Sequence, residues 1–192
     1  MNHLDIRNIH KFDCEEMFKF AVNYFPTDSH FVEIGVAEGK SSAYLAVEII
    51  NSNKQIKLDC IDAWLMKTDS SKDYTQTFRN NLKPIWDKLD ISVIQNYSTE
   101  ASKLYSDESL DFVFIDGDHS YEGLSADIIN WLPKIKSNGI IAGHDYTTEY
   151  KTNVIKAVDE YFGKENVNTN VSSWYVFMKD IKIEKYKKNS LL

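Results

Sequence analysis

Acidic and histidine side chains follow several short apolar runs of this sequence, at the points where those runs end. Asp62 closes one run, Asp116 and His119 follow another, and His144 and Asp145 follow a third. Carboxylates and imidazoles are groups that bind cations and move protons near neutral pH. If the runs are parallel strands of one sheet, their carboxyl ends lie along one edge, where open α/β proteins bind ligands. We therefore expect these side chains to share one site.

The acids after the last two of these runs are candidates for a metal site. Adjacent parallel strands lie ~4.8 Å apart, so we expect Asp116 and Asp145 to converge. Two close carboxylates either share a proton or bind a cation, and hard oxygen ligands favour Mg²⁺, Ca²⁺ or Mn²⁺. His144, as a third ligand, shifts the preference toward a transition metal. The alternative is that Asp116 caps a helix or binds a cofactor and that no metal is present.

The two histidines at these strand ends are candidates for a general base. An imidazole can take a proton from a hydroxyl group near neutral pH, and His119 and His144 both follow predicted strands. The alternative is that either histidine is an ordinary surface residue. The sequence does not decide which of the two is the base.

A glycine-rich turn follows an earlier apolar run, Phe31–Ile34. Gly35 permits a sharp turn and Gly39 permits a close approach of a ligand to the backbone, as in the strand–turn–helix units that bind nucleotides. The spacing lacks the third glycine of the dinucleotide fingerprint. Glu33 would also repel a pyrophosphate and suits a ligand that carries an ammonium or sulfonium cation.

Three further residues at predicted strand ends suit a nucleoside. Asp62 can accept two hydrogen bonds from ribose hydroxyls. Tyr97 and Ser98 follow the third predicted strand, where a base ring would lie. The simpler alternatives are that Asp62 caps a helix or is a solvated loop acid, and that Ser98 caps a helix.

The apolar patterns predict elements that would position these residues. Strands are expected over 30–35, 56–62, 91–95, 112–116 and 140–143, with Asn138-Gly139 as a turn. Helices are expected between Asp13 and Pro26, with Asp13 and Glu16 as a capping box, and over about 40–52, 74–82, 98–105, 121–135 and 154–162. Strands 166–171 and 174–178 are joined by only Ser172-Ser173, which forces an antiparallel hairpin. The predicted fold is α/β, a Rossmann-like three-layer sandwich with a mostly parallel sheet.

Length and composition favour one domain over residues 1–192, with an N-terminal helical segment (1–28) and a basic tail (182–192). The net charge of −7 argues against a nucleic acid or an anionic membrane as partner. No signal peptide or membrane span is expected. Cys14 and Cys60 form no disulfide or metal pattern, and we interpret both as thiols in a reducing cytoplasm.

Two groups of residues resemble a known family. Glu33-Ile-Gly-x-x-x-Gly39 resembles the first motif of class I S-adenosylmethionine-dependent methyltransferases. Phe114-Ile-Asp-Gly-Asp-His-Ser-Tyr-Glu-Gly123, followed by Asp127, Trp131-Leu-Pro133, Gly139 and Gly143-His-Asp-Tyr146, resembles the small bacterial branch that includes macrocin-type sugar O-methyltransferases. The similarity covers roughly residues 29–146.

The resemblance implies a seven-stranded sheet whose last strand is antiparallel. It implies that Glu33 and the Gly35 turn hold the methionine part of S-adenosylmethionine, that Asp62 holds the ribose, and that Tyr97-Ser98 flanks the adenine. It also implies a divalent metal at Asp116 and at acids after the fifth strand, with His119 as the base. In this sequence the fifth strand ends in His144-Asp145 instead of two acids, which bears on the presence and identity of the metal.

The resulting hypothesis is methyl transfer from S-adenosylmethionine to a hydroxyl of a small molecule, of sugar or phenol type. A divalent cation such as Mg²⁺ would assist. The alternatives are an NAD-type oxidoreductase and a non-catalytic S-adenosylmethionine-binding module. We expect the segments 64–73 and 146–150 to shape the acceptor pocket, which is either open or completed by a second copy in a homo-oligomer.

Overall fold

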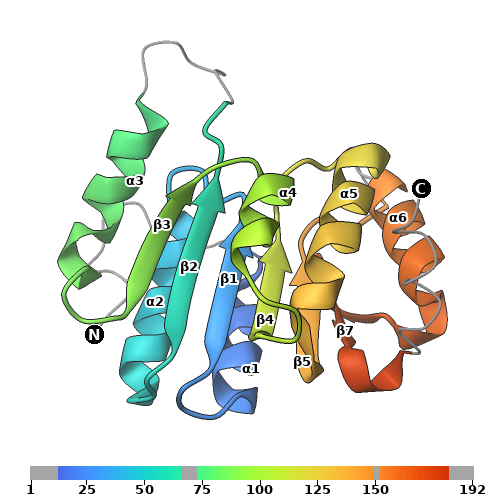
Figure 1. Cartoon of the computed structure of the whole chain (residues 1–192), viewed down its shortest axis with the longest axis horizontal. Coiled ribbons are helices and arrows are strands. Elements are labelled where there is room, and N and C mark those ends of the chain that lie inside the picture. Colours follow the sequence, from blue (N-terminus) through green and yellow to red (C-terminus); the bar gives the residue numbers. More distant parts are fainter. Residues whose placement is uncertain (1–12, 66–72, 149–151, 182–192) are drawn as a thin grey trace.

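The computed structural model of the chain describes residues 13–65, 73–148 and 152–181. Over these residues one sheet contains seven strands in the order β3-β2-β1-β4-β5-β7-β6 (Figure 1). The strands are β1 (His30–Ile34), β2 (Lys57–Asp62), β3 (Ile91–Gln95), β4 (Leu110–Ile115), β5 (Ile135–Gly143), β6 (Asn168–Asn170) and β7 (Ser173–Phe177). Strands β1 to β5 pair in parallel, and β7 is antiparallel to both β5 and β6. The predicted sheet and its C-terminal hairpin are confirmed.

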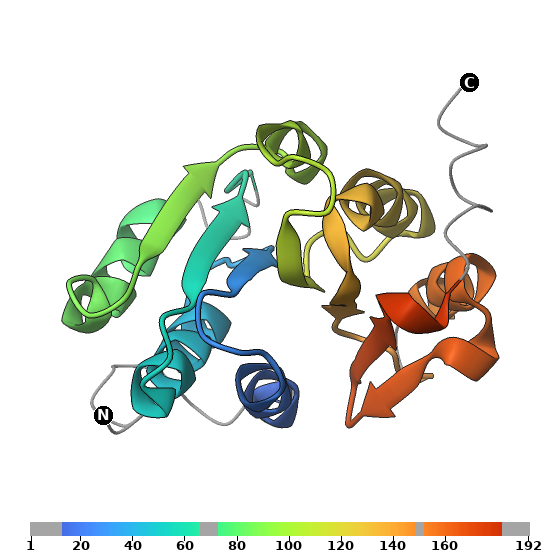
Figure 2. The same ribbon diagram turned by 60° about the horizontal axis from the view of Figure 1, so that its bottom comes forward.

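Helices cover both faces of the sheet and complete the predicted three layers (Figure 2). One face carries α1 (Glu15–Tyr24), α2 (Lys40–Ser52) and α3 (Tyr74–Leu82), and the other carries α4 (Ser98–Ala101), α5 (Tyr121–Trp131) and α6 (Thr152–Phe162). Because successive side chains of a strand point to opposite faces, each strand supplies both cores. Phe112 and Phe114 of β4 join the α1–α3 side, whereas Val113 and Ile115 join the α4–α6 side.

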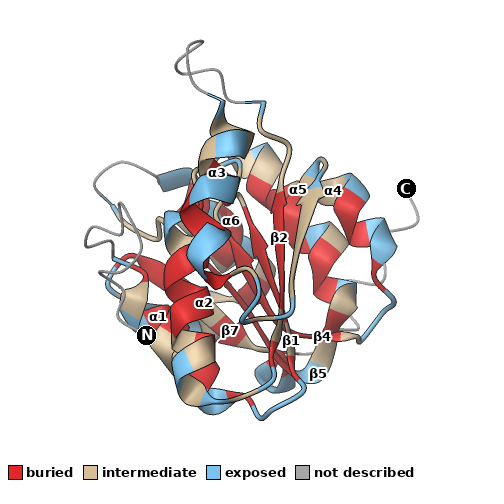
Figure 3. Ribbon diagram, turned by 90° about the vertical axis from the view of Figure 1, so that its left-hand side faces the viewer, coloured by how far each residue is buried: buried red, intermediate tan, exposed pale blue. Residues whose placement is uncertain are grey.

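Burial is greatest in the central strands, as expected for parallel strands between helices (Figure 3). Every residue of β4 is buried. Trp131 of α5 and Trp174 of β7 are fully buried beside it on the α4–α6 side. Within the described residues, no helix combines the length and the apolar character that crossing a membrane requires. The predicted basic tail and residues 1–12 of the predicted N-terminal segment lie outside the described residues.

Two predicted helix caps are wrong, because their side chains have distant partners. Cys14, not Asp13, is the N-cap of α1, and no side chain caps that end. The Asp13 carboxylate instead contacts His144 and Ser172. Tyr97 is the N-cap of α4, and the Ser98 hydroxyl accepts a hydrogen bond from the Trp131 indole at 2.7 Å.

The predicted turn at Asn138-Gly139 is also wrong, because β5 begins at Ile135 and runs through it. The register between β4 and β5 shifts between Leu110 and Phe112, so the two strands stay paired on both sides of this irregular step. A Cβ at Gly139 would lie 2.5 Å from Ile135 Cγ2 and 2.8 Å from the Asp111 carbonyl oxygen. The glycine therefore serves close packing within a strand, not a reversal of the chain. The preceding helix ends at Trp131, and Leu132–Lys134 forms a 3-10 turn around Pro133.

Candidate active site

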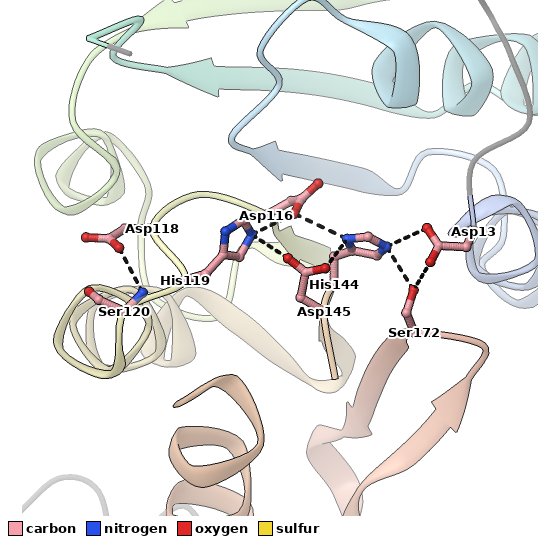
Figure 4. A network of polar contacts seen from close by, with 8 residues as sticks. All are labelled: Asp13, Asp116, Asp118, His119, Ser120, His144, Asp145 and Ser172. Carbon is pink, nitrogen blue, oxygen red and sulfur yellow. Dashed lines mark hydrogen bonds and ion pairs between the residues drawn. The ribbon is translucent and has the colours of Figure 1, made fainter. Parts of the chain in front are cut away.

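The ends of β4 and β5 bring the predicted metal and base residues together. Ile115 and Gly143 are register partners, so the residues that follow them, Asp116 and His144, leave the sheet side by side. The His144 amide donates to the Ile115 carbonyl at 3.1 Å, which continues the pairing one step further. Asp145 then adopts a φ of +63°, so that a turn replaces the extended strand. Four predicted side chains meet at this point (Figure 4).

Two imidazoles and two carboxylates alternate in this cluster. His119 Nε2 lies 3.0 Å from Asp116 Oδ1 and 3.1 Å from Asp145 Oδ2. His144 Nδ1 lies 3.3 Å from Asp145 Oδ1 and 3.6 Å from Asp116 Oδ1. Ligand atoms of Asp116, His144 and Asp145 all lie within 4.8 Å of one another. Two carboxylate oxygens and one imidazole nitrogen are a suitable donor set for a divalent cation, so these residues fit a metal.

The acids of the cluster favour the charged form of His144. Burial lowers the pKa of His144, but the carboxylates of Asp116 and Asp13 outweigh it and raise that pKa to about 9. Burial likewise opposes ionisation of Asp116, yet hydrogen bonds from His119 and His144 keep the pKa of Asp116 below its usual value. His144 is therefore a cation at neutral pH when it has no metal. A metal ligand must be deprotonated, so a bound cation would replace the proton of His144.

Sequence reasoning missed two residues of this site, Asp13 and Ser172. Asp13 Oδ1 lies 2.7 Å from His144 Nε2, and the Ser172 Oγ lies 2.9 Å from the same nitrogen. The Ser172 hydroxyl also donates to Asp13 Oδ2. Asp13 precedes α1, and Ser172 lies in the turn between β6 and β7. No local pattern signals these contacts, because they join segments far apart along the chain.

The glycine turn after β1 has the expected left-handed backbone. Gly35 and Gly39 have φ values of +83° and +80°. A Cβ at Gly35 would lie 2.1 Å from the Asp116 carbonyl oxygen, and one at Gly39 would lie 2.6 Å from Leu82 Cδ1. The close approach that we expected at Gly39 is thus made to α3, and Gly35 approaches the backbone just after β4. Gly35 in particular lets the glycine turn lie directly against Asp116, one of the residues predicted to bind a metal.

Glu33 lies below the glycine turn and not on its surface. It is fully buried between its register partners Cys60 and Phe114. Neither carboxylate oxygen has a hydrogen-bond partner of good geometry among the described residues. Burial raises the pKa of Glu33 to about 7, although the nearby hydroxyls of Ser41 and Ser42 oppose the rise. Direct contact with a ligand requires movement of the turn above it and stays a prediction.

Asp62 fixes the glycine turn to the end of β2. Its Oδ2 accepts from the Ala37 amide at 2.8 Å, and its Oδ1 accepts from the Trp64 amide at 2.6 Å. The Trp64 indole in turn donates to the Ala37 carbonyl at 2.8 Å. Each carboxylate oxygen keeps a further lone pair, so ribose binding by Asp62 stays a prediction compatible with these contacts.

Tyr97 supplies an exposed ring after β3, the strand that pairs with β2. Its side chain is among the exposed large hydrophobic groups of the described residues, with 58% of the residue accessible. The neighbouring Asn96 amide donates to the Asp62 carbonyl at 3.1 Å, which holds the ends of β2 and β3 together. An accessible aromatic ring after β3 and a carboxylate at the end of the neighbouring strand β2 suit a nucleoside, whose base stacks and whose ribose donates hydrogen bonds.

The strand order, the glycine turn after β1 and the acid at the end of β2 are those expected of a class I S-adenosylmethionine-dependent methyltransferase. Residues 32–146, more than half of the chain, match a family described as "Methyltransferase domain". The chain belongs to this family. The predicted S-adenosylmethionine-dependent methyltransferase, and not the NAD-type alternative, agrees with this match.

Solved structures of methyltransferases share this fold. The O-methyltransferase NovP is 19% identical with a TM-score of 0.60, over 86% of this chain and 79% of its own. The calicheamicin methyltransferase CalS11 is 11% identical with a TM-score of 0.67, over 86% and 77%. A putative rRNA methylase from Clostridium thermocellum is 13% identical with a TM-score of 0.59, over 87% and 96%. Since the acceptors named for these proteins differ, the shared fold does not identify the acceptor of this chain.

Among curated proteins, an uncharacterized protein, y4gI, of Sinorhizobium fredii is 38% identical over 47 residues. The match covers 24% of this chain and 5% of that protein, so the chain spans a small part of its relative's length.

Proposed function

We propose that this methyltransferase acts on a hydroxyl group of a small molecule, of sugar or phenol type, with the help of a divalent cation held by Asp116, His144 and Asp145. The observation that carries the proposal is the convergence of two carboxylates and two imidazoles at the ends of β4 and β5. Two structures of the same fold are described as an O-methyltransferase and as a TDP-rhamnose 3'-O-methyltransferase, which agrees with a hydroxyl acceptor. The net charge of −7 disfavours a nucleic acid as acceptor.

S-adenosylmethionine supplies an electrophilic methyl group, and a bound cation would orient the acceptor hydroxyl and lower its pKa. The chain's own residues would position the cofactor relative to the acceptor. The glycine turn that Asp62 fixes lies against Asp116, and Tyr97 offers its ring to the adenine. Much of the acceleration of an in-line transfer comes from such positioning.

We assign the role of general base to His119. Its side chain is 31% exposed, against 18% for His144, so an acceptor reaches it more easily. Asp116 and Asp145 face its Nε2 at 3.0 and 3.1 Å and would stabilise the charge that arrives with the proton. The His144 Nε2 is instead held by Asp13 at 2.7 Å while Nδ1 faces Asp145 at 3.3 Å, which suits a residue that stays in place as a metal ligand.

Calorimetry and methyl-transfer assays test the proposal separately. We expect the protein to bind S-adenosylhomocysteine, and to bind Mn²⁺ or Mg²⁺ with an affinity that Asp116→Asn and Asp145→Asn each abolish. Radiolabelled methyl transfer to a panel of sugars and phenols should stop when a chelator is added. Turnover that survives complete removal of divalent ions would refute the metal, and transfer to amines or RNA alone would refute the hydroxyl acceptor. Light scattering shows whether a homo-oligomer forms, which one of the two alternatives for the acceptor pocket requires.

A further inference from the structure

We propose that Asp13 and Ser172 are positioning residues that hold the His144 ring with Nδ1 facing Asp116 and Asp145. The inference rests on the proposed metal site and assigns a role to two residues that do not themselves bind the metal. It concerns the orientation of the His144 ring, one of the proposed metal ligands, and not the chemistry of the methyl transfer.

The two nitrogens of His144 have different surroundings. Nε2 lies 2.7 Å from Asp13 Oδ1 and 2.9 Å from Ser172 Oγ, which are ordinary hydrogen-bond lengths. Nδ1 lies 3.3 and 3.6 Å from the nearest oxygens of Asp145 and Asp116, which makes both of these contacts longer than either contact of Nε2. The ring is therefore held from the Nε2 side and presents Nδ1 to the two acids (Figure 4).

One arrangement of protons satisfies all of these contacts. The Ser172 hydroxyl donates to Asp13 Oδ2, so its lone pairs are left to face the ring. Nε2–H then donates to Asp13 Oδ1, with Ser172 Oγ as a second acceptor. The opposite tautomer would point the lone pair of Nε2 at a carboxylate that only accepts. A neutral His144 thus keeps its proton on Nε2 and offers the lone pair of Nδ1.

This is the chemistry that a metal-binding histidine needs. Histidine ligands commonly donate their second ring N–H to a carboxylate, which fixes the tautomer and raises the basicity of the ligating nitrogen. A Ser–His–Asp nucleophile is excluded, because such a triad places the serine and the acid on opposite ring nitrogens. Here both Asp13 and Ser172 contact Nε2.

Both supporting residues are themselves anchored. Asp13 lies two residues before the start of α1, and the far end of α1 is held by Lys54, whose ammonium donates to the carbonyls of Val22 and Phe25 at 2.6 Å each. The Ser172 carbonyl accepts from the Tyr146 amide at 2.7 Å, which ties the β6–β7 turn to the segment that carries His144. The orientation of one ligand thus depends on two elements remote in sequence.

The test is the affinity for Mn²⁺, measured by calorimetry on the whole chain. Asp13→Asn should weaken Mn²⁺ binding by about 10–100-fold, as expected for loss of the carboxylate behind a histidine ligand. The matched control is Glu16→Gln, which makes the same charge change on the exposed side of α1 and should leave the affinity unchanged. S-adenosylhomocysteine affinity should be the same in all variants, which shows that each is folded. Ser172→Ala should weaken Mn²⁺ binding less than Asp13→Asn.

A second background separates positioning from a general effect of charge. His144→Asp replaces the ring by a carboxylate that has no second nitrogen for Asp13 to hold. In that background Asp13→Asn should no longer weaken Mn²⁺ binding. Pulsed EPR of bound Mn²⁺ should also show coupling to an imidazole nitrogen in the wild type and in Glu16→Gln, but not in His144→Asp.

Each outcome bears on the inference. Equal weakening by Asp13→Asn in both backgrounds, or no weakening in either, overturns the positioning role while the metal site stands. Absence of divalent-ion binding in the wild type overturns the inference together with the metal part of the proposed function. S-adenosylhomocysteine binding in that same sample shows whether the methyltransferase assignment survives.

Discussion

Gly35→Ala should destabilise the protein because Gly35 lies against the backbone of Asp116. Its φ is +83°, and a Cβ there would lie 2.1 Å from the Asp116 carbonyl oxygen and 2.7 Å from the Gly117 amide nitrogen. Both are backbone atoms, so no side chain can rotate away. The left-handed backbone costs an alanine about 1–2 kcal/mol, and overpacking costs about 1–3 kcal/mol. We expect the free energy of unfolding to fall by about 2–5 kcal/mol.

Gly117→Ala is a matched control from the same contact. A Cβ at Gly117 would meet no atom closer than 3.6 Å, and the residue does not have a left-handed backbone. The gain from a less flexible unfolded chain is about 0.4–1 kcal/mol. We therefore expect the stability of this variant to stay within about 1 kcal/mol of the wild type.

Urea unfolding followed by tryptophan fluorescence measures both variants. For a chain of this size each kcal/mol shifts Tm by about 2–4 °C, so thermal unfolding should show the same order. Gly35→Ala should also weaken binding of S-adenosylhomocysteine and of Mn²⁺ together, since the cofactor turn and Asp116 share the contact. Equal stability of the two variants would show that the contact between Gly35 and Asp116 does not constrain the fold.

His119→Ala should lower kcat by about 10²–10⁴ with unchanged affinity for S-adenosylhomocysteine, and undiminished turnover would assign the base elsewhere. Tyr105→Phe should cost about 1.5–3 kcal/mol in urea unfolding, because its hydroxyl donates to the buried Asp59 carboxylate at 2.8 Å. Tyr121→Phe is the control, because the Tyr121 hydroxyl donates to Glu160 at an exposed position, and we expect it to leave the urea midpoint nearly unchanged. Burial raises the pKa of Asp59, but hydrogen bonds from His30 and Tyr105 outweigh burial and hold that pKa below its ordinary 3.8. The stability that Asp59 contributes is therefore present above that pH and lost as pH falls through the lower folded value, and Asp59→Asn should flatten the acid limb of a stability–pH curve.

The strands were predictable because their signals are local. The apolar run of β4 and the glycines after β1 are read directly from neighbouring residues, and strand ends then place Asp116 and His144 at one edge. The two-residue link before β7 likewise dictates an antiparallel hairpin. These features need no knowledge of distant contacts, and the structure confirms them.

The wrong predictions occur mainly where a polar side chain can hydrogen-bond to either a local or a distant partner. Asp13 and Ser98 are both good capping residues by type, yet each contacts a residue on another element. Gly139 has the composition of a turn, but it lies within β5 because the neighbouring backbone at Asp111 leaves no room for a Cβ. Competition of this kind depends on the packed structure, so the sequence pattern could not resolve it.

A methyltransferase has to hold a sulfonium and an acceptor atom in line, and the contact between β1 and β4 suits this requirement. The Asp116 amide donates to the Ile34 carbonyl at 2.8 Å, immediately before Gly35 lies against the Asp116 carbonyl. The turn proposed for the cofactor and the acid proposed for the metal are therefore parts of one rigid backbone contact, without an intervening side chain. Because a misplacement of about 1 Å can cost about 10²-fold in rate, a shared backbone contact is a more reliable support than two loops that move separately. It also explains why a bulky residue at position 35 would disturb both sites at once.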